Sequence, residues 1–143
     1  MLARMMLRIR EEAASVFAAI ARYYSYLYHG ALTLFLIGVA GMALASSPAS
    51  LRLDMLPWTG ATLTHVVFFG GLLGLLTVVL AFFQKLPVLF FVWSLIVPVL
   101  MIKGYIFSGY GFEPGGFARA AELLAGALIA IAGPWMQMRP AKR

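Results

Sequence analysis

Apolar residues fill four long stretches of the chain, and polar and charged residues gather between them. Each stretch approaches the roughly 20 mostly apolar residues that a helix needs to cross the hydrocarbon core of a bilayer. The predicted spanning helices cover about residues 24–45, 62–83, 87–107 and 117–138. The connection at Gln84–Leu86 is so short that its two helices must be antiparallel neighbours. The pattern therefore predicts an all-α integral membrane four-helix bundle.

The first 22 residues follow a different pattern. Apolar side chains recur there at helical spacing, and polar side chains occupy the opposite face. A helix of this kind typically lies in the membrane interface. We therefore expect an amphipathic interfacial helix at residues 1–22, followed by the bundle at residues 23–143. This helix serves either as an anchor for the first span or as a docking surface for a partner subunit.

Composition supports a membrane protein. Hydrophobic residues make up 63% of the 143 residues and charged residues 11%, whereas soluble domains have about 45–50% and about 25%. The net charge is +6, and the basic residues lie beside the apolar spans, which favours anionic lipid headgroups over nucleic acid as their partner. The chain has no cysteine, which excludes disulfides, thiolate metal sites and thiol redox chemistry within it.

The basic residues also predict an orientation. Eight of the eleven fall on one side of the predicted bundle. They are Arg4, Arg8, Arg10, Arg22, Lys85, Arg139, Lys142 and Arg143. The other side has Arg52, Lys103 and Arg119. By the positive-inside rule, both termini are expected in the cytoplasm, with the protein in the inner (cytoplasmic) membrane.

Small residues on the spans predict where helices pack. In lipid, helices associate through close contact of small side chains rather than through exclusion of water. The candidates are Gly38, Gly41, Gly70, Gly74, Gly126, Ala130 and Gly133. They either close this bundle or seat helices of other chains. Pro98 and Pro134 each remove one backbone hydrogen bond and predict kinks in the third and fourth spans.

Few ionisable residues lie within the spans, and each is a candidate functional group. His65, Lys103 and Glu122 fall at similar depth on the outer side. They predict an outer-leaflet polar pocket in which Lys103 and Glu122 pair, with Tyr105 nearby, and which binds a quinone headgroup, a lipid or a small polar ligand. The alternative is that Lys103 extends to the interface and Glu122 pairs with Arg119 on its own helix.

No catalytic constellation is visible in the sequence. It shows no nucleophile–base arrangement, no carboxylate pair and no phosphate-binding glycine loop, and the two histidines lie nearly a membrane thickness apart. We expect no metal site and no cofactor belonging to this chain itself. The inner half of the spans offers few polar residues, which argues against a transport path.

Two segments resemble the DoxX-like membrane family. Tyr28-His29-Gly30 opens the first span, and the second contains Gly70-Gly71-Leu72-Leu73-Gly74-Leu75-Leu76, which is similar to that family's Gly-Gly-Leu-rich helix. The resemblance covers roughly residues 23–138. It implies a small inner-membrane subunit tied to a quinone-linked or redox complex. The family commonly has an acidic residue before the glycine pair, where this chain has Phe68 and Phe69.

Three functions follow as hypotheses. The leading one is a small non-catalytic accessory subunit of a larger inner-membrane complex, redox- or quinone-linked, with membrane lipids and other membrane subunits as partners. The second is a DoxX-type subunit that binds quinone in the outer pocket. The third is a small oligomeric transporter, against which the uncharged first span argues.

Overall fold

The computed structural model describes residues 1–46, 56–109 and 111–139, and within them every regular element is helical. The elements are α1 (Leu2–Ala45), α2 (Gly60–Phe82), α3 (Pro87–Ile102), the π-helical turn η1 (Lys103–Phe107), α4 (Gly116–Ala130) and α5 (Ala132–Met138). Four helical units, with η1 continuing α3 and α5 continuing α4, are long and apolar enough to cross a membrane. The predicted all-α membrane bundle is thereby confirmed. Arg52, Lys142 and Arg143 lie outside the described residues.

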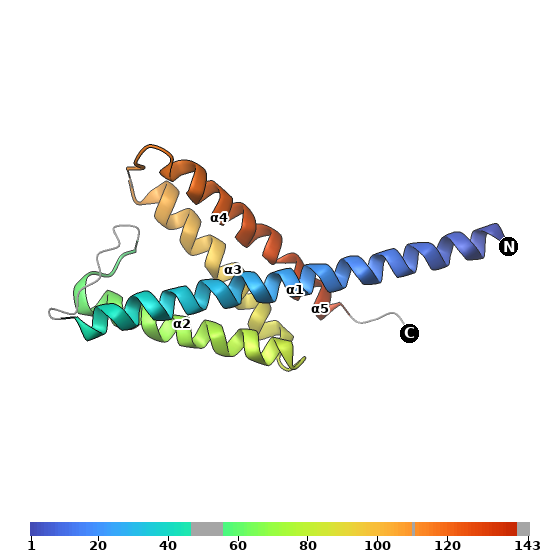
Figure 1. Cartoon of the computed structure of the whole chain (residues 1–143), viewed down its shortest axis with the longest axis horizontal. Helices are drawn as coiled ribbons and strands as arrows, with labels where there is room; N and C mark the ends of the chain where they lie inside the picture. Colours follow the sequence, from blue (N-terminus) through green and yellow to red (C-terminus); the bar gives the residue numbers. More distant parts are fainter. Residues whose placement is uncertain (47–55, 110, 140–143) are drawn as a thin grey trace.

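The four units form two arms that meet near one end (Figure 1). α1 and α2 pack side by side as one arm, and α3 and α4 form the other. We call the end with the short α2–α3 connection the turn end, and the opposite end the loop end. The arms cross near the turn end, where α5 packs against α1, and they diverge toward the loop end.

Residues 2–45 form one uninterrupted helix. The predicted interfacial helix at 1–22 and the first predicted span at 24–45 are continuous, with no break between them. The physical reason is that no glycine or proline precedes Gly30 and that alanines are frequent, so nothing interrupts the backbone hydrogen bonds. Residues 1–17 are exposed and extend beyond the crossing of the arms (Figure 1).

The tight turn between α2 and α3 is built from two left-handed residues. The Lys85 N–H donates to the Leu80 carbonyl at 2.8 Å, and the Gln84 N–H donates to the Ala81 carbonyl at 2.9 Å. This pair of bonds is the Schellman motif that ends many helices, and Gln84 (φ 60°) occupies its left-handed position. Leu86 (φ 51°) is also left-handed, and α3 then starts at Pro87, a favoured first residue of a helix.

The two prolines have different effects. α3 continues through Pro98 to Ile102 before it widens into η1. The fourth unit is divided at Ile131, between α4 and α5. Pro134 lies three residues later, lacks an N–H, and cannot donate to the carbonyl of Ala130. The division places α5 across α1 near the turn end.

Three glycines allow the helices to approach closely. A methyl group at Gly74 of α2 would collide with the Trp93 ring and the Thr33 methyl group. One at Gly126 of α4 would lie 2.8 Å from the Tyr28 ring, and one at Gly133 of α5 would lie 2.7 Å from the Ala21 carbonyl oxygen. Gly133 therefore lets α5 contact the backbone of α1 directly, whereas Gly74 and Gly126 accommodate side chains of neighbouring helices against their own backbone.

The remaining predicted packing residues divide into two groups. Ala130 is fully buried, and Gly41 has only an ordinary contact with Phe68 at 3.9 Å. Gly38 and Gly70 face open space, with no atom within 4 Å of the position a methyl group would take. Gly71, which the sequence pattern did not single out, is the second close contact of α2: its methyl position lies 3.3 Å from the Ile37 nitrogen. The GxxxG pair of α2 therefore works through Gly74 and not through Gly70.

We predict that Gly74→Ala destabilises the protein and that Gly70→Ala does not. The added methyl group at residue 74 has to displace Trp93 or Thr33, and overpacking of this kind typically costs about 1–3 kcal/mol. At residue 70 the same methyl group meets open space and improves helix propensity. Thermal unfolding of both purified variants in the same detergent measures the difference. Equal melting temperatures for the two variants would contradict the packing described here.

Candidate functional site

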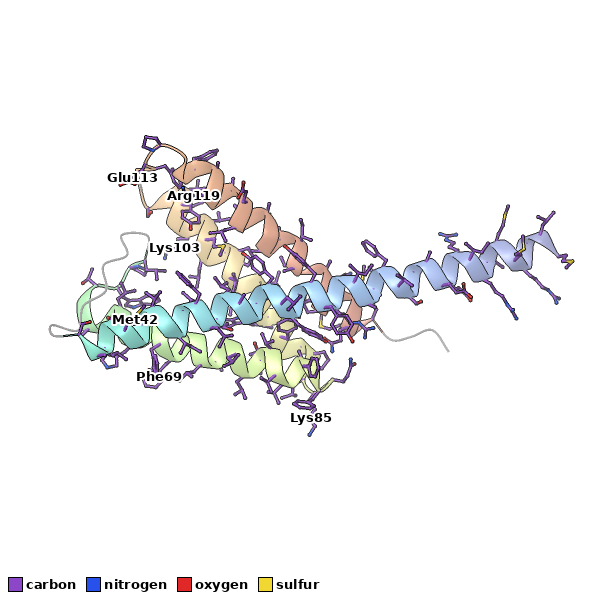
Figure 2. The ribbon with its side chains drawn as sticks, viewed as in Figure 1. Met42, Phe69, Lys85, Lys103, Glu113 and Arg119 are labelled. Atoms are coloured by element: carbon purple, nitrogen blue, oxygen red, sulfur yellow. The ribbon has the colours of Figure 1, made fainter. Side chains whose placement is uncertain are left out.

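The structure distributes the four residues of the predicted outer pocket over both arms. His65 lies on α2, whereas Lys103 and Tyr105 lie on η1 and Glu122 lies on α4. His65, Lys103 and Glu122 are exposed and Tyr105 is partly buried. Within the part of the chain that the structure describes, Lys103 and Glu122 form no ion pair with each other. Figure 2 shows Lys103 at the loop end of the α3–α4 arm.

The divergence of the arms explains this distribution. Glu122 lies one turn before Gly126 on α4 and shares its helical face, and Gly126 contacts α1 through Tyr24 and Tyr28. The contact with α1 reaches as far as Leu123, whose carbonyl accepts a hydrogen bond from the Tyr28 hydroxyl at 2.6 Å. Gly126 is partly buried there, whereas the Glu122 side chain is exposed, and the two arms diverge toward the loop end (Figure 1). Ligand binding by these residues stays a prediction.

Polar side chains gather inside the bundle on its turn-end side instead. They are Ser25, His29 and Thr33 of α1, Thr77 of α2 and Ser94 of α3, each buried. The sequence predicted few polar groups in this half of the spans. Three of the five, however, recur at four-residue spacing on α1, which places them on one helical face. We call these five residues the buried polar cluster.

The hydroxyl groups of this cluster bond to their own helices. Thr33 donates to the His29 carbonyl at 2.8 Å, Thr77 to the Gly74 carbonyl at 2.7 Å and Ser94 to the Phe91 carbonyl at 2.7 Å. A hydroxyl that bonds back to its own helix needs no partner from another helix. These side chains are therefore compatible with burial in a membrane protein.

His29 is different because its side chain is only half satisfied. Nδ1 lies 3.0 Å from the Ser25 carbonyl oxygen, which can only accept, so Nδ1 carries the proton and Nε2 is an acceptor. Nε2 is buried without a hydrogen-bond partner. The ring packs edge-on against Phe90 of α3 and against Tyr28, at 5.3 and 5.4 Å between ring centroids. Leaving a buried acceptor unpaired typically costs about 1–3 kcal/mol.

Trp93 supplies an unmatched donor near the same crossing. Its indole N–H is also buried without a partner, and its ring covers Gly74 together with Thr33. His29 lies one turn before Thr33 on α1. Together with the buried Oε1 of Gln137 on α5, which also lacks a partner, the described core holds two unpaired acceptors and one unpaired donor. Groups of this kind bind water or a small polar ligand.

The Ala81 carbonyl ties three helices together next to this cluster. It accepts from the Tyr26 hydroxyl of α1 at 3.2 Å and from the Gln137 amide of α5 at 3.1 Å. The Tyr26 ring packs against Phe90 at 5.7 Å. It also lines a pocket of about 170 Å³ at the turn end, together with Arg22, Tyr23, Phe82 and Gln84. Tyr26 thus lies between this pocket and the His29–Phe90 contact.

The described residues contain no cluster of three or more His, Asp or Glu side chains placed to hold a metal ion. The chemistry of the crossing is that of neutral hydrogen-bonding groups. Such an arrangement can orient helices or bind a small polar molecule.

A second candidate lies on the surface of α1. Exposed residues, all but Ala13 large and apolar, form a line along one side of the helix, which we call the α1 stripe. They are Leu2, Met6, Ile9, Ala13, Val16, Ile20, Tyr23 and Leu27. Leu2 is 68% exposed and Leu27 is 73% exposed. An apolar surface of this length on a soluble or interfacial segment marks an interaction site.

We predict that His29→Phe leaves the melting temperature unchanged or raises it slightly. Phenylalanine keeps a flat ring against Phe90 and removes the unpaired acceptor, and replacing a poorly satisfied polar group by an apolar one of similar shape is often neutral or stabilising. The melting temperature in detergent measures the effect, and Thr33→Val is the control, because it removes a hydroxyl that has a hydrogen-bond partner. A loss of several degrees for His29→Phe would show that Nε2 has a partner that this chain does not supply.

Comparisons with known proteins assign no family to this arrangement. No family model, no curated protein and no solved structure matches the chain. The DoxX-like resemblance therefore rests on the sequence segments at Tyr28-His29-Gly30 and Gly70–Leu76, and the functional argument rests on the geometry.

Proposed function

We propose that this chain is a small non-catalytic accessory subunit of a larger membrane assembly, and that α1 is the element that binds its neighbour. The observation that carries the proposal is the α1 stripe. Residues 1–17 are exposed throughout, yet one side of this segment is apolar. A surface of this kind is stable only when something covers it.

Covering the α1 stripe lowers the free energy of the protein. Covering one large aliphatic side chain is worth about 1.5–3 kcal/mol relative to leaving it in water. Six of the seven large apolar side chains of the α1 stripe precede the predicted span at residue 24, so their burial is worth on the order of 10 kcal/mol before the cost of association. That is comparable to the whole stability of a typical domain.

The shape of α1 favours a protein over the lipid surface as the cover. A helix that leaves a span and lies down on the membrane needs a sharp bend, which almost always occurs at proline, glycine or a π-bulge. α1 has none of these before Gly30. Its first 22 residues, roughly 30 Å long at 1.5 Å per residue, therefore continue along the line of the span. Any link to quinone or redox chemistry follows only from the DoxX-like resemblance.

We predict that charges on the α1 stripe release the chain from its assembly. The protein extracted from its native membrane in mild detergent should have a mass well above the 15.6 kDa of one chain, by size exclusion with light scattering. The double variant Ile9→Lys with Val16→Lys should run at a smaller mass, because lysine at a buried interface is costly. The matched control is Ala14→Lys with Ser15→Lys, which adds the same charge away from the stripe.

The control double variant should keep the wild-type mass. The proposal fails if the wild-type protein already runs as a single chain, or if both double variants reduce the mass equally.

The buried polar cluster favours a second candidate, the small transporter. Polar groups inside a membrane bundle mark candidate ion or proton paths, and His29 has an acceptor atom free inside the protein. Purified protein in liposomes loaded with a pH-sensitive dye tests this directly. Proton flux that requires the protein and disappears in His29→Phe would support the transporter; no flux above empty liposomes would remove it.

A further inference from the structure

The spacing of the α1 stripe carries more information than its polarity. Its members follow one another at alternating intervals of four and three residues, from Leu2 through Ile9 and Val16 to Leu27. A single face of an isolated helix needs only the looser period of 3.6 residues. A strict alternation of four and three is the a/d repeat of two helices that pack along a common seam. The repeat extends over more than three heptads.

The same side of α1 continues into the membrane with small residues. Ala31, Gly38 and Ala45 follow at intervals of seven residues, and all three are exposed in the single chain. Around Gly38 nothing lies within 4 Å of the position a methyl group would take. Helices in lipid pack most closely through small residues. One side of α1 therefore carries a large apolar seam outside the bundle and a small-residue seam inside the membrane.

The charges of the N-terminal segment are compatible with a parallel copy of the same helix. In a parallel pair, the residue that directly precedes each position a of the repeat faces the residue five positions later on the partner helix. Met5 thereby faces Arg10, and Glu12 faces Phe17, so no like charges meet across the seam. The remaining charged groups, such as Arg4 and Arg8, point to the opposite side of the helix.

Membrane topology makes a second copy the natural occupant. Two copies inserted in one membrane share the same orientation, so their stripes run parallel with equal residues at equal depth. Large apolar side chains offer on the order of 100 Å² each. Seven of them therefore provide roughly 700 Å² per copy, close to the roughly 800 Å² that each partner contributes to a standard interface.

We propose that the α1 stripe binds the α1 stripe of a second copy of this chain, forming a parallel two-helix coil that begins outside the bundle and continues into the membrane. This inference rests on the proposed function, because it names the neighbour that α1 binds. The assembly is then built around a dimer, and the other helices remain on the outer sides of the pair for further contacts.

The absence of cysteine from the sequence makes a clean test available. Single cysteines are placed in the full-length chain at Ile9, Val16 and Ile20 on the stripe, and at Arg8 and Ser15 on the opposite face. Native membranes are oxidised with copper phenanthroline and analysed by non-reducing gel electrophoresis. All five positions are exposed in the single chain, so the substitutions should leave the fold intact, which size exclusion of the reduced proteins verifies.

The expected result is a disulfide-linked dimer at the three stripe positions, with roughly tenfold less at the other two, because a disulfide requires Cα atoms within about 7 Å. Equal cross-linking at all five positions reports random collision and overturns the proposal. If cross-links form only to a different polypeptide, the proposed pairing with a second copy is wrong, but the proposed accessory function stands. If no cross-link forms and a membrane-impermeant maleimide labels the stripe cysteines as readily as Ser15→Cys, no protein covers the stripe and both proposals fail.

Discussion

The close approach of α1 to its neighbours at Gly74 and Gly133 is the contact on which the rest of the fold depends. Lipid gives helices no reason to associate through water exclusion, so close van der Waals packing at small residues supplies the attraction. Both contacts involve the middle part of α1, between Ala21 and Thr33. The arms are therefore joined near the turn end and free to diverge at the loop end (Figure 1).

The same crossing determines which polar groups the bundle can enclose. Where backbones approach this closely, only short side chains fit, and serine and threonine satisfy their hydroxyl groups on their own helices. The His29 side chain is too long to satisfy both of its ring nitrogens on its own helix. One nitrogen reaches the Ser25 carbonyl, and the other remains in the core beside Phe90. The hydroxyl groups of the buried polar cluster are thus compatible with tight helix packing, and His29 is the exception because its Nε2 has no partner.

The sequence predicted the spans well because hydropathy and length are local properties. The second, third and fourth units differ from the predicted ranges by two residues or fewer at each end. Hydropathy does not show whether the residues of the predicted outer pocket lie close together, because equal depth in a membrane does not imply proximity. His65 and Glu122 lie on α2 and α4, which belong to arms that diverge toward the loop end (Figure 1). Ser25, His29 and Thr33 could have been predicted as a polar face of the first span, since their four-residue spacing is visible in the sequence.

α1 shows how one helix can serve two sets of contacts. Its polar side outside the bundle, with Arg8, Ser15 and Arg22, is in line with the side that carries His29. That side packs against α2 and α5 and touches α3 through the His29–Phe90 ring contact. Its apolar side is in line with Gly38 and faces away from the chain. A soluble amphipathic helix buries its apolar face in its own protein. Because α1 does the reverse, its apolar side is available to another helix, both outside the bundle and inside the membrane.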